Sequence, residues 1–170
     1  MDLSVFEDMN KKQLKDYIHF LLFNYRVMDA FWFIKTTEHF DLETAEKLNE
    51  EVWDRVAGFA GKDLREKFDF GQKGLKGFVK ALKLFPWCIL VGYDFEENDD
   101  EVLITVRECP AQAARRKRGL GEYVCKHMHY KEFASFAKEI DDRIKVECIF
   151  APPDPHPEDI DCKWRFTIEE

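Results

Sequence analysis

Residues 144–169 read IKVECIFAPPDPHPEDIDCKWRFTIE, and this stretch decides the fold that we expect. Its two ends, 144–150 and 162–169, are rich in β-branched and aromatic residues, which favour strands. Between them, four prolines fall within residues 152–157, where they fix φ along most of the connection. The stretch therefore predicts a β-hairpin with a stiff loop, which suits either the rim of a pocket or a plain rigid connection.

A second hairpin is expected upstream of the first. Residues 87–96 (WCILVGYDFE) and 101–108 (EVLITVRE) are β-rich, and the segment 97–100 (ENDD) that joins them has the composition of a turn. Between the two hairpins, the sequence predicts a short polar helical segment after Pro110 and an amphipathic helix over about 122–140. Hairpins impose antiparallel pairing, and helices inserted between them can cover one face of the sheet.

Three helices are expected before the hairpins. Asn10 can cap the first, Asp41 can cap a second that runs to about Phe68, and a third covers residues 75–85 and ends at Pro86. The first helix is apolar around nearly its whole circumference. It is therefore expected either to be buried on most sides or to lie in a dimer interface.

The order of these elements predicts an α+β fold, in which N-terminal helices are followed by two β-hairpins separated by helix. The hairpins would form a four-stranded antiparallel sheet covered by helices. A chain of 170 residues fits one domain, with a helical part over about 1–86 and a sheet-containing part over about 87–170.

Composition narrows the class of protein. The net charge of −8 argues against nucleic acid as a partner, and no apolar run approaches the roughly 20 residues that span a bilayer. The acidic N-terminal stretch MDLSVFEDMNKKQ lacks the pattern of a secretory signal, so we expect a cytoplasmic protein with no membrane partner. In that reducing compartment, the five cysteines indicate burial, metal binding or reactivity rather than disulfides.

Four cysteines are candidates for one site: Cys109 at the end of the second predicted strand, Cys125 near a helix start, Cys148 within the third strand and Cys162 at the start of the fourth. If the two hairpins lie side by side, these positions bring the four sulfurs to one edge of the sheet. Zinc is then the first expected metal and an iron–sulfur cluster the second, although the spacing matches no zinc-finger pattern. The alternative for each cysteine is simple burial as a small hydrophobic side chain.

Cys125 is also a candidate nucleophile. The nearby helix N-terminus, together with Lys126 and Arg118, is expected to lower its thiol pKa, and His127 or His129 could act as the base. Either histidine could instead replace one sulfur as a metal ligand.

A polar stripe interrupts the apolar first helix. His19, Arg26 and Asp29 fall within about a quarter-turn of one another at 100° per residue. With Trp32, they are the candidate ligand-binding residues, in a cavity with a carboxylate-binding arginine and an acid/base histidine. The alternative is a solvent-facing side on which Arg26 and Asp29 pair with each other.

The C-terminal half resembles an uncharacterised prokaryotic family through the Gly-Leu-x-Glu-x-x-Cys segment, here Gly119 to Cys125, and through three further motifs. Here these read Cys109-Pro110-Ala111-Gln112, Pro152 to Glu158 (PPDPHPE), and Cys162 to Phe166 (CKWRF). More distantly, the order of elements resembles 4-vinyl reductase domains and L-2-amino-thiazoline-4-carboxylate hydrolase-like proteins. The resemblance to 4-vinyl reductase domains implies a dimeric small-molecule-binding fold with cysteines linked to a metal or cluster.

Our leading hypothesis is a cytoplasmic sensor or carrier of the 4-vinyl reductase type, which binds a small hydrophobic or aromatic molecule and a metal. One alternative is a thiol- or metal-dependent hydrolase of a small cyclic carboxylic acid. The other is a homodimeric interaction module, without metal, that pairs through its aromatic first helix. A homodimer is expected in the leading case as well.

Overall fold

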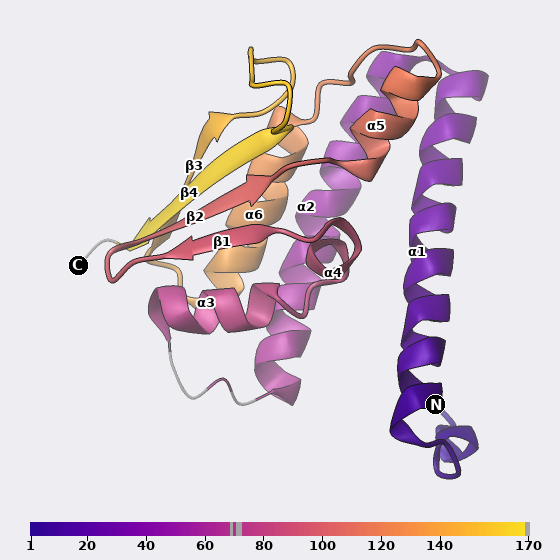
Figure 1. The fold of residues 1–170 in the computed structure, drawn as a ribbon, viewed down its shortest axis with the longest axis vertical. Coiled ribbons are helices and arrows are strands. Elements are labelled where there is room, and N and C mark those ends of the chain that lie inside the picture. Colours follow the sequence, from indigo (N-terminus) through magenta and orange to yellow (C-terminus); the bar gives the residue numbers. More distant parts are fainter. Residues whose placement is uncertain (69, 71–72, 169–170) are drawn as a thin grey trace.

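The computed structural model describes residues 1–68, 70 and 73–168 (Figure 1). After a short 3-10 turn, its α-helices are α1 (Lys11–His39), α2 (Leu42–Lys67), α3 (Gly74–Leu82), α4 (Pro86–Val91), α5 (Pro110–Lys117) and α6 (Lys126–Ile140). Its strands are β1 (Asp94–Glu97), β2 (Glu101–Val106), β3 (Ile144–Phe150) and β4 (Cys162–Ile168). Glu169, which was expected to end the last strand, lies outside the described residues. The predicted α+β class is confirmed.

The strands form one antiparallel sheet in the order β1-β2-β4-β3, so the two hairpins lie side by side through β2 and β4. Val106 at the end of β2 pairs with Cys162 at the start of β4. Helix α6 lies against one face of this sheet and α2 packs against α6, with α3 beside them (Figure 1). The expectation of a four-stranded antiparallel sheet covered by helices is therefore confirmed.

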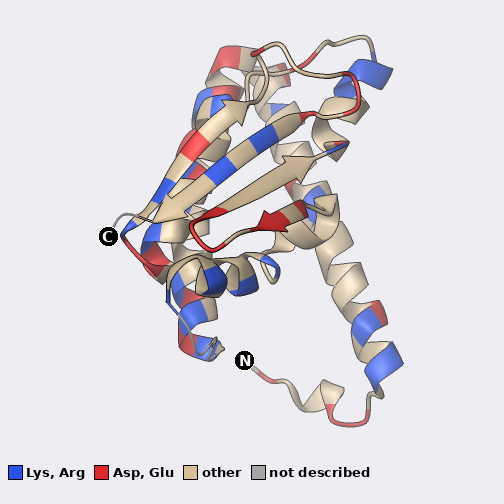
Figure 2. Ribbon diagram, turned by 60° about the vertical axis from the view of Figure 1, so that its left-hand side comes forward, with Lys and Arg blue, Asp and Glu red and all other residues tan. Residues whose placement is uncertain are grey.

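The other face of the sheet carries ion pairs between charged residues, which appear as blue and red segments of the strands in Figure 2. Arg165 on β4 lies between Glu147 (2.9 Å) and Glu101 (3.2 Å), and Lys163 pairs with Glu96 at 3.3 Å. Exposed ion pairs of this kind each contribute little to stability. They identify the side of the sheet that faces water and leave the opposite side for the core.

The two long N-terminal helices begin where their caps predict. The Asn10 side chain accepts hydrogen bonds from the Lys12 and Gln13 amides at 2.9 and 3.0 Å, and the Gln13 side chain accepts from the Asn10 amide. Asp41 accepts from the Thr44 amide at 2.6 Å. These bonds satisfy amide donors that the first turn of a helix leaves free.

The segment around Pro86 differs from the prediction. The helix α3 ends at Leu82, and Pro86 starts the short helix α4 at its N1 position, where a missing amide costs nothing. Gly92, with φ of 76°, ends α4, and the strand begins only at Asp94. A short apolar run fits a buried helix as well as a strand, so hydrophobic pattern alone could not separate the two.

The helix α6 begins at Lys126, four residues later than expected. Gly119 and Gly121 adopt positive φ of 68° and 65°, which interrupts any earlier helix. The Gln112 side chain then bonds both the amide and the carbonyl of Tyr123, at 3.1 and 3.0 Å. Because those backbone groups are already paired, the preceding loop is fixed without a helix.

The first helix is not buried in the single chain. No residue of α1, all of which lie in the described part, is buried, so the expectation of burial on most sides is wrong for one chain. Its contacts with the rest of the protein follow one stripe through Tyr25, Asp29 and Phe33. No helix among the described residues is both long and apolar enough to cross a bilayer.

Gly61 marks the closest approach of α2 to α6. A Cβ atom there would lie 2.9 Å from the Phe136 carbonyl oxygen and 3.1 Å from Glu139 Cβ, whereas one at Gly58 would lie 3.9 Å from its nearest neighbour. We expect Gly61→Ala to lower the free energy of unfolding by about 1–3 kcal/mol, because the helices must separate. The matched control Gly58→Ala should raise it by up to about 1 kcal/mol through helix propensity. Urea denaturation of both variants checks this, and equal stability of the two would contradict the close contact.

Candidate functional site

A cavity of about 60 Å³ lies between the sheet and helices α1, α2, α4 and α6. Its walls are largely aromatic, formed by Trp53, Trp87, Tyr93, Tyr123, Phe133 and Trp164. At roughly 10–15 Å³ for each enclosed water, the space holds about four to six water molecules. It is smaller than the cavity of about 150 Å³ that admits benzene in another protein. Without rearrangement, an occupant has only a handful of heavy atoms.

Three of the four candidate metal-binding cysteines line this cavity: Cys109, Cys125 and Cys162. The pairing of β2 with β4 places Cys109 and Cys162 at the same end of the sheet. The amide of Cys125 donates to the Pro152 carbonyl at 3.2 Å, which ties the start of α6 to the loop between β3 and β4. Residues far apart in the sequence therefore meet at the sheet edge.

Cys148 has a different position. It lies on β3 directly opposite Trp164 on β4, is partly exposed, and does not line the cavity. The neighbouring charges are Lys126 and Asp154, which pair with each other at 2.7 Å. Cys148 is thus outside the cavity wall, although it lies near enough to Cys162 to contribute to the raised pKa of that thiol.

The sulfurs are not arranged as a closed metal site. Within the described residues, one group of three Cys, His, Asp or Glu side chains has all its ligand atoms within 4.8 Å of one another, and it contains no cysteine. Thiolates on one tetrahedral zinc lie roughly 3.8 Å apart, given Zn–S bonds of about 2.3 Å. The sulfurs would have to draw together around a metal, so zinc or an iron–sulfur cluster at the cysteines stays a prediction.

The group with close ligand atoms consists of Glu122, His156 and Asp161. Arg116 donates to Glu122 and to Asp161, each at 2.7 Å, and His156 Nε2 lies 3.2 Å from Glu122. The guanidinium already supplies the positive charge that these carboxylates need. We interpret the group as a structural network of ion pairs and hydrogen bonds that joins α5 to the proline-rich loop at the edge of the cavity.

The pKa of the candidate nucleophile, Cys125, is raised, whereas the sequence predicted that it would be lowered. Burial raises the pKa of the Cys125 thiol to about 12, and burial also raises the pKa values of Cys109 and Cys162. The expected effect of Lys126 is lost because its ammonium group pairs with Asp154. At neutral pH, Cys125 is therefore a protonated thiol and a poor nucleophile.

A histidine–carboxylate pair stands on the cavity side of α6. His129 Nδ1 lies 2.6 Å from Glu132 Oε2, and the glutamate side chain is only 1% exposed. Both residues line the cavity, whereas His127 is exposed on the other side of α6. Sequence reasoning proposed His129 and missed Glu132, although a glutamate next to Phe133 on the apolar side of a helix was the available signal.

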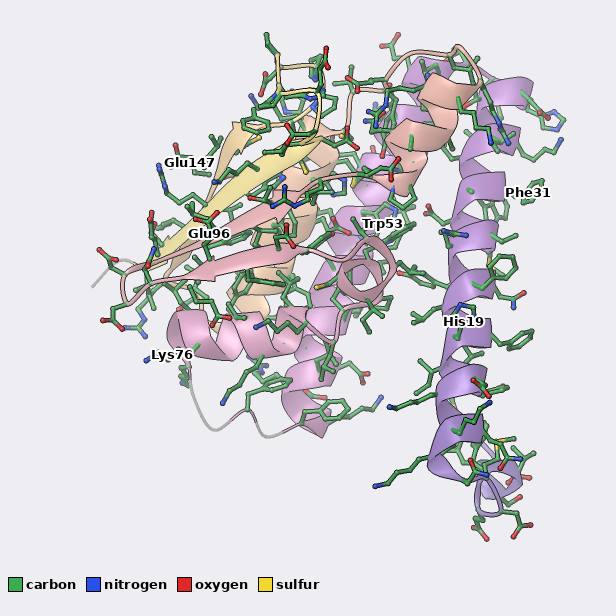
Figure 3. All side chains as sticks on the ribbon, viewed as in Figure 1. His19, Phe31, Trp53, Lys76, Glu96 and Glu147 are labelled. Carbon is green, nitrogen blue, oxygen red and sulfur yellow. The ribbon has the colours of Figure 1, made fainter. Side chains whose placement is uncertain are left out.

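Asp29 is the member of the predicted polar stripe that reaches the cavity. Its carboxylate accepts a hydrogen bond from Trp53 Nε1 at 3.2 Å. Figure 3 shows Trp53 on the side of α2 that faces α1. Burial raises the pKa of Asp29 from its ordinary value of 3.8 to about 6, and the nearby charge of Glu132 acts in the same direction.

The other members of the stripe lie elsewhere. His19 and Trp32 are exposed, with Trp32 at 71%, and neither lines the cavity. The guanidinium of Arg26 lies 5.8 Å from the Phe23 ring centroid on its own helix and is also absent from the described cavity walls. The expected pairing of Arg26 with Asp29 is replaced by the bond from Trp53.

Two polar groups at the cavity were not proposed from the sequence. Gln112 is fully buried on α5 and donates to Cys125 Sγ at 3.3 Å, which explains why a glutamine follows Cys109-Pro110. Trp164 is also fully buried, and its Nε1 has no oxygen or nitrogen acceptor among the described residues, because it faces the sulfur of Cys162, which accepts hydrogen bonds only weakly. A buried donor without an acceptor costs about 1–3 kcal/mol.

Thiol reactivity tests the electrostatics of the site. With a pKa near 12 instead of 9.0, Cys125 has about 1,000-fold less thiolate at neutral pH than an unperturbed thiol. We expect iodoacetamide at pH 7.5 to modify Cys125 and Cys162 at least that much more slowly than the exposed thiol introduced by Leu120→Cys, as followed by peptide mass spectrometry. Faster labelling of Cys125 than of the control thiol would show an activated nucleophile.

Comparison with known proteins gives a family but no activity. No curated protein matches the sequence. A family model described as a family of unknown function, DUF6125, matches residues 7–168 and so spans all the elements from α1 to β4. The chain therefore belongs to the DUF6125 family of unknown function.

Proposed function

We propose that this protein binds a small molecule in the aromatic cavity and acts as a ligand-binding domain, a sensor or a carrier. The observation that carries the proposal is the indole N–H of Trp164, which is fully buried at the cavity wall with the weakly accepting Cys162 sulfur beside it and no oxygen or nitrogen acceptor among the described residues. Buried donors in folded proteins are nearly always paired with protein, water or ligand atoms. A ligand or ordered water in the cavity would supply the missing acceptor.

The composition of the walls supports a ligand more than a filled core. Protein interiors are normally close-packed, with few voids larger than a water molecule. Here the space stays open, and the half-buried Asp29 and His129 and the buried Glu132 gather around it. Burying such groups costs free energy that a purely structural core avoids by using apolar residues. Contacts with a bound molecule can offset that cost.

The resemblance to 4-vinyl reductase domains agrees with this proposal, because it implies a cavity between helices and sheet. The small hydrophobic or aromatic ligand inferred from the sequence agrees with the six aromatic wall residues. A cytoplasmic location is part of the proposal as well, and the five free cysteines are compatible with a reducing compartment.

The hydrolase alternative receives less support. A thiol with a pKa of about 12 cannot supply a thiolate at neutral pH without a further activating group. The adjacent acid–base pair, His129 and Glu132, is held through the imidazole Nδ1, and within the described residues the other ring nitrogen makes no hydrogen bond to a thiol. Thiol-based hydrolysis therefore ranks below ligand binding.

Tryptophan fluorescence provides a direct test of cavity binding. Trp53, Trp87 and Trp164 line the cavity, so Trp32→Phe removes the one exposed tryptophan and leaves three reporters. We expect at least one of 1-propanol, propylamine and propionate to produce a saturable fluorescence change at millimolar concentration. These probes have the few heavy atoms that the cavity admits.

Two matched variants locate the binding. Ala111 lies at the cavity on an exposed position of α5, whereas Ala114 is exposed on the same helix away from it. Ala111→Phe should abolish the saturable change because the ring narrows the entrance, and Ala114→Phe should preserve it. If no probe saturates in the parent protein, or if both variants bind alike, the cavity is not the ligand site.

We propose, as a second role, that α1 pairs with α1 of a second copy of this chain. Helix α1 is largely free of charge in its middle (Figure 2), and Phe31 points away from α2 (Figure 3). Its exposed large apolar side chains are Ile18, Phe20, Leu21, Phe23, Met28, Phe31 and Trp32, each between 48% and 71% exposed. Contiguous apolar surface of this kind marks an interaction site.

The amount of surface fits a homodimer. At 150–250 Å² for a large apolar side chain, the exposed parts of these seven residues sum to on the order of 800 Å². A stable interface buries about 800 Å² on each partner. Leu14, Leu21 and Met28 recur every seven residues, which is the spacing that lets two helices interdigitate. A two-fold pair of α1 helices would cover this surface.

Negative charge introduced into the exposed apolar surface of α1 tests the proposed dimer. We expect the double substitution Leu21→Glu and Met28→Glu to give a monomer, because the two copies would have to bury four carboxylates. The control Leu120→Glu makes the same chemical change at an exposed loop position far along the chain from α1 and should leave the dimer intact. Sedimentation velocity at micromolar concentration measures both, and a monomeric parent protein would contradict the proposal.

A further inference from the structure

The ionisable groups that line the cavity have an excess of negative charge. Asp29 and Glu132 are its two carboxylates without a basic partner of their own other than His129. Asp161 also lines the cavity, but Arg116 neutralises it from outside. No lysine or arginine is among the described residues of the cavity wall. A single imidazole therefore accompanies one buried acid, Glu132, and one half-buried acid, Asp29.

The two acids interact through the cavity. Glu132 contributes to the raised pKa of Asp29, and burial is the larger cause. The groups that face Asp29 come from three directions: Tyr25 on its own helix, Trp53 on α2, and His129 with Glu132 on α6. Trp53 donates one hydrogen bond, which is weak compensation for a charge removed from water. A cation between the carboxylates would lower the cost of ionising both.

The aromatic rings of the cavity wall also favour a positively charged ligand. The ring faces of tryptophan, tyrosine and phenylalanine attract cations through their quadrupole, and the attraction grows when the site excludes water. Trp53, Trp87 and Trp164 all border the cavity, and tryptophan is the strongest of the three ring types. A box of rings with carboxylates at one side is suited to an ammonium group that carries a short apolar chain.

We propose that the molecule bound in this cavity is a small organic ammonium ion, held by Asp29 and Glu132 among the aromatic rings. This inference rests on the ligand-binding role proposed above and names its ligand class. It replaces the carboxylic acid expected from Arg26, since that arginine does not line the cavity and an anion would face two like charges. The N–H of Trp164 remains available for an oxygen of the ligand or for a bound water.

The test compares three probes of one size that differ in charge. Propylamine is a cation at pH 7.5, 1-propanol is neutral and propionate is an anion. We expect propylamine to bind at least about 10-fold more tightly than 1-propanol, since a hydrogen bond to a charged group strengthens binding by about 10- to 100-fold. Propionate should show no saturable change. Isothermal titration and tryptophan fluorescence in the Trp32→Phe protein give the affinities.

Isosteric variants identify the groups responsible. Asp29→Asn and Glu132→Gln should each weaken propylamine by about 10- to 100-fold and leave 1-propanol within about 3-fold. The control Glu96→Gln removes a carboxylate on the charged outer face of the sheet (Figure 3) and should change neither affinity. If Glu132→Gln fails to fold, Asp29→Asn and the pH profile still decide the outcome.

The pH dependence has a defined sign. Asp29 is mostly ionised at pH 7.5 and mostly protonated at pH 5, because its pKa is about 6. Propylamine affinity should therefore fall by about 10-fold between these pH values. Since the pKa of Asp29 is raised on folding, acidification over this range does not destabilise the fold through this group. Affinity for 1-propanol should stay constant.

The possible results separate the two proposals. Equal or tighter binding of 1-propanol or propionate, or propylamine affinity unchanged in Asp29→Asn, would overturn the ammonium assignment while the cavity remained a ligand site. Absence of saturable binding for all three probes would overturn both proposals. Preference for propylamine that disappears in Asp29→Asn and survives in Glu96→Gln supports both.

Discussion

The pairing of β2 with β4 is the constraint on which the rest of the structure depends. It joins two hairpins that are separated by some forty residues of helix and loop, and it sets Val106 opposite Cys162. The Asp161 amide, one residue earlier, donates to the Val106 carbonyl at 2.9 Å and extends the pairing. Without this register, the end of the first hairpin and the start of the last strand would not share one edge, and the cavity would lose a wall.

Helix α6 positions the ionisable side chains His129 and Glu132 relative to the sheet. Its start is fixed by the bond from Cys125 to the proline-rich loop, so the positions that follow at helical spacing face the sheet. Met128 and Phe133 are apolar members of that face, while His129 and Glu132 are polar members at the same depth. Burial of a glutamate next to Phe133 opposes the hydrophobic effect that drives α6 onto the sheet. The imidazole offsets part of this cost.

The sequence predicted the parts of the fold that depend on local signals. Side-chain caps at Asn10 and Asp41 and the turn-separated strands were sufficient for the helix starts and the hairpins. Local signals failed where tertiary contacts decide: residues 86–91 form a helix, and the side chain of Gln112 keeps Tyr123 out of α6. In the site, Cys109, Cys125 and Cys162 meet at the cavity, as topology suggested, whereas Cys148 lies outside its wall and Glu132 was not anticipated. An acid on an apolar helix face can be recognised as buried only when its neighbours are known.

Helix α1 joins the two proposed roles through one stripe of contacts. Tyr25, Asp29 and Phe33 hold it to Trp53 and Tyr123, and all of α1 otherwise lies at the surface. A helix fixed by so few contacts has little intrinsic resistance to shifting along the body of the protein. Pairing with a second α1 would restrict that motion and thereby fix the position of Asp29 in the cavity. Conversely, an ammonium ion between Asp29 and the α6 carboxylate would hold α1 in place and favour the dimer, since coupling between two binding events is reciprocal.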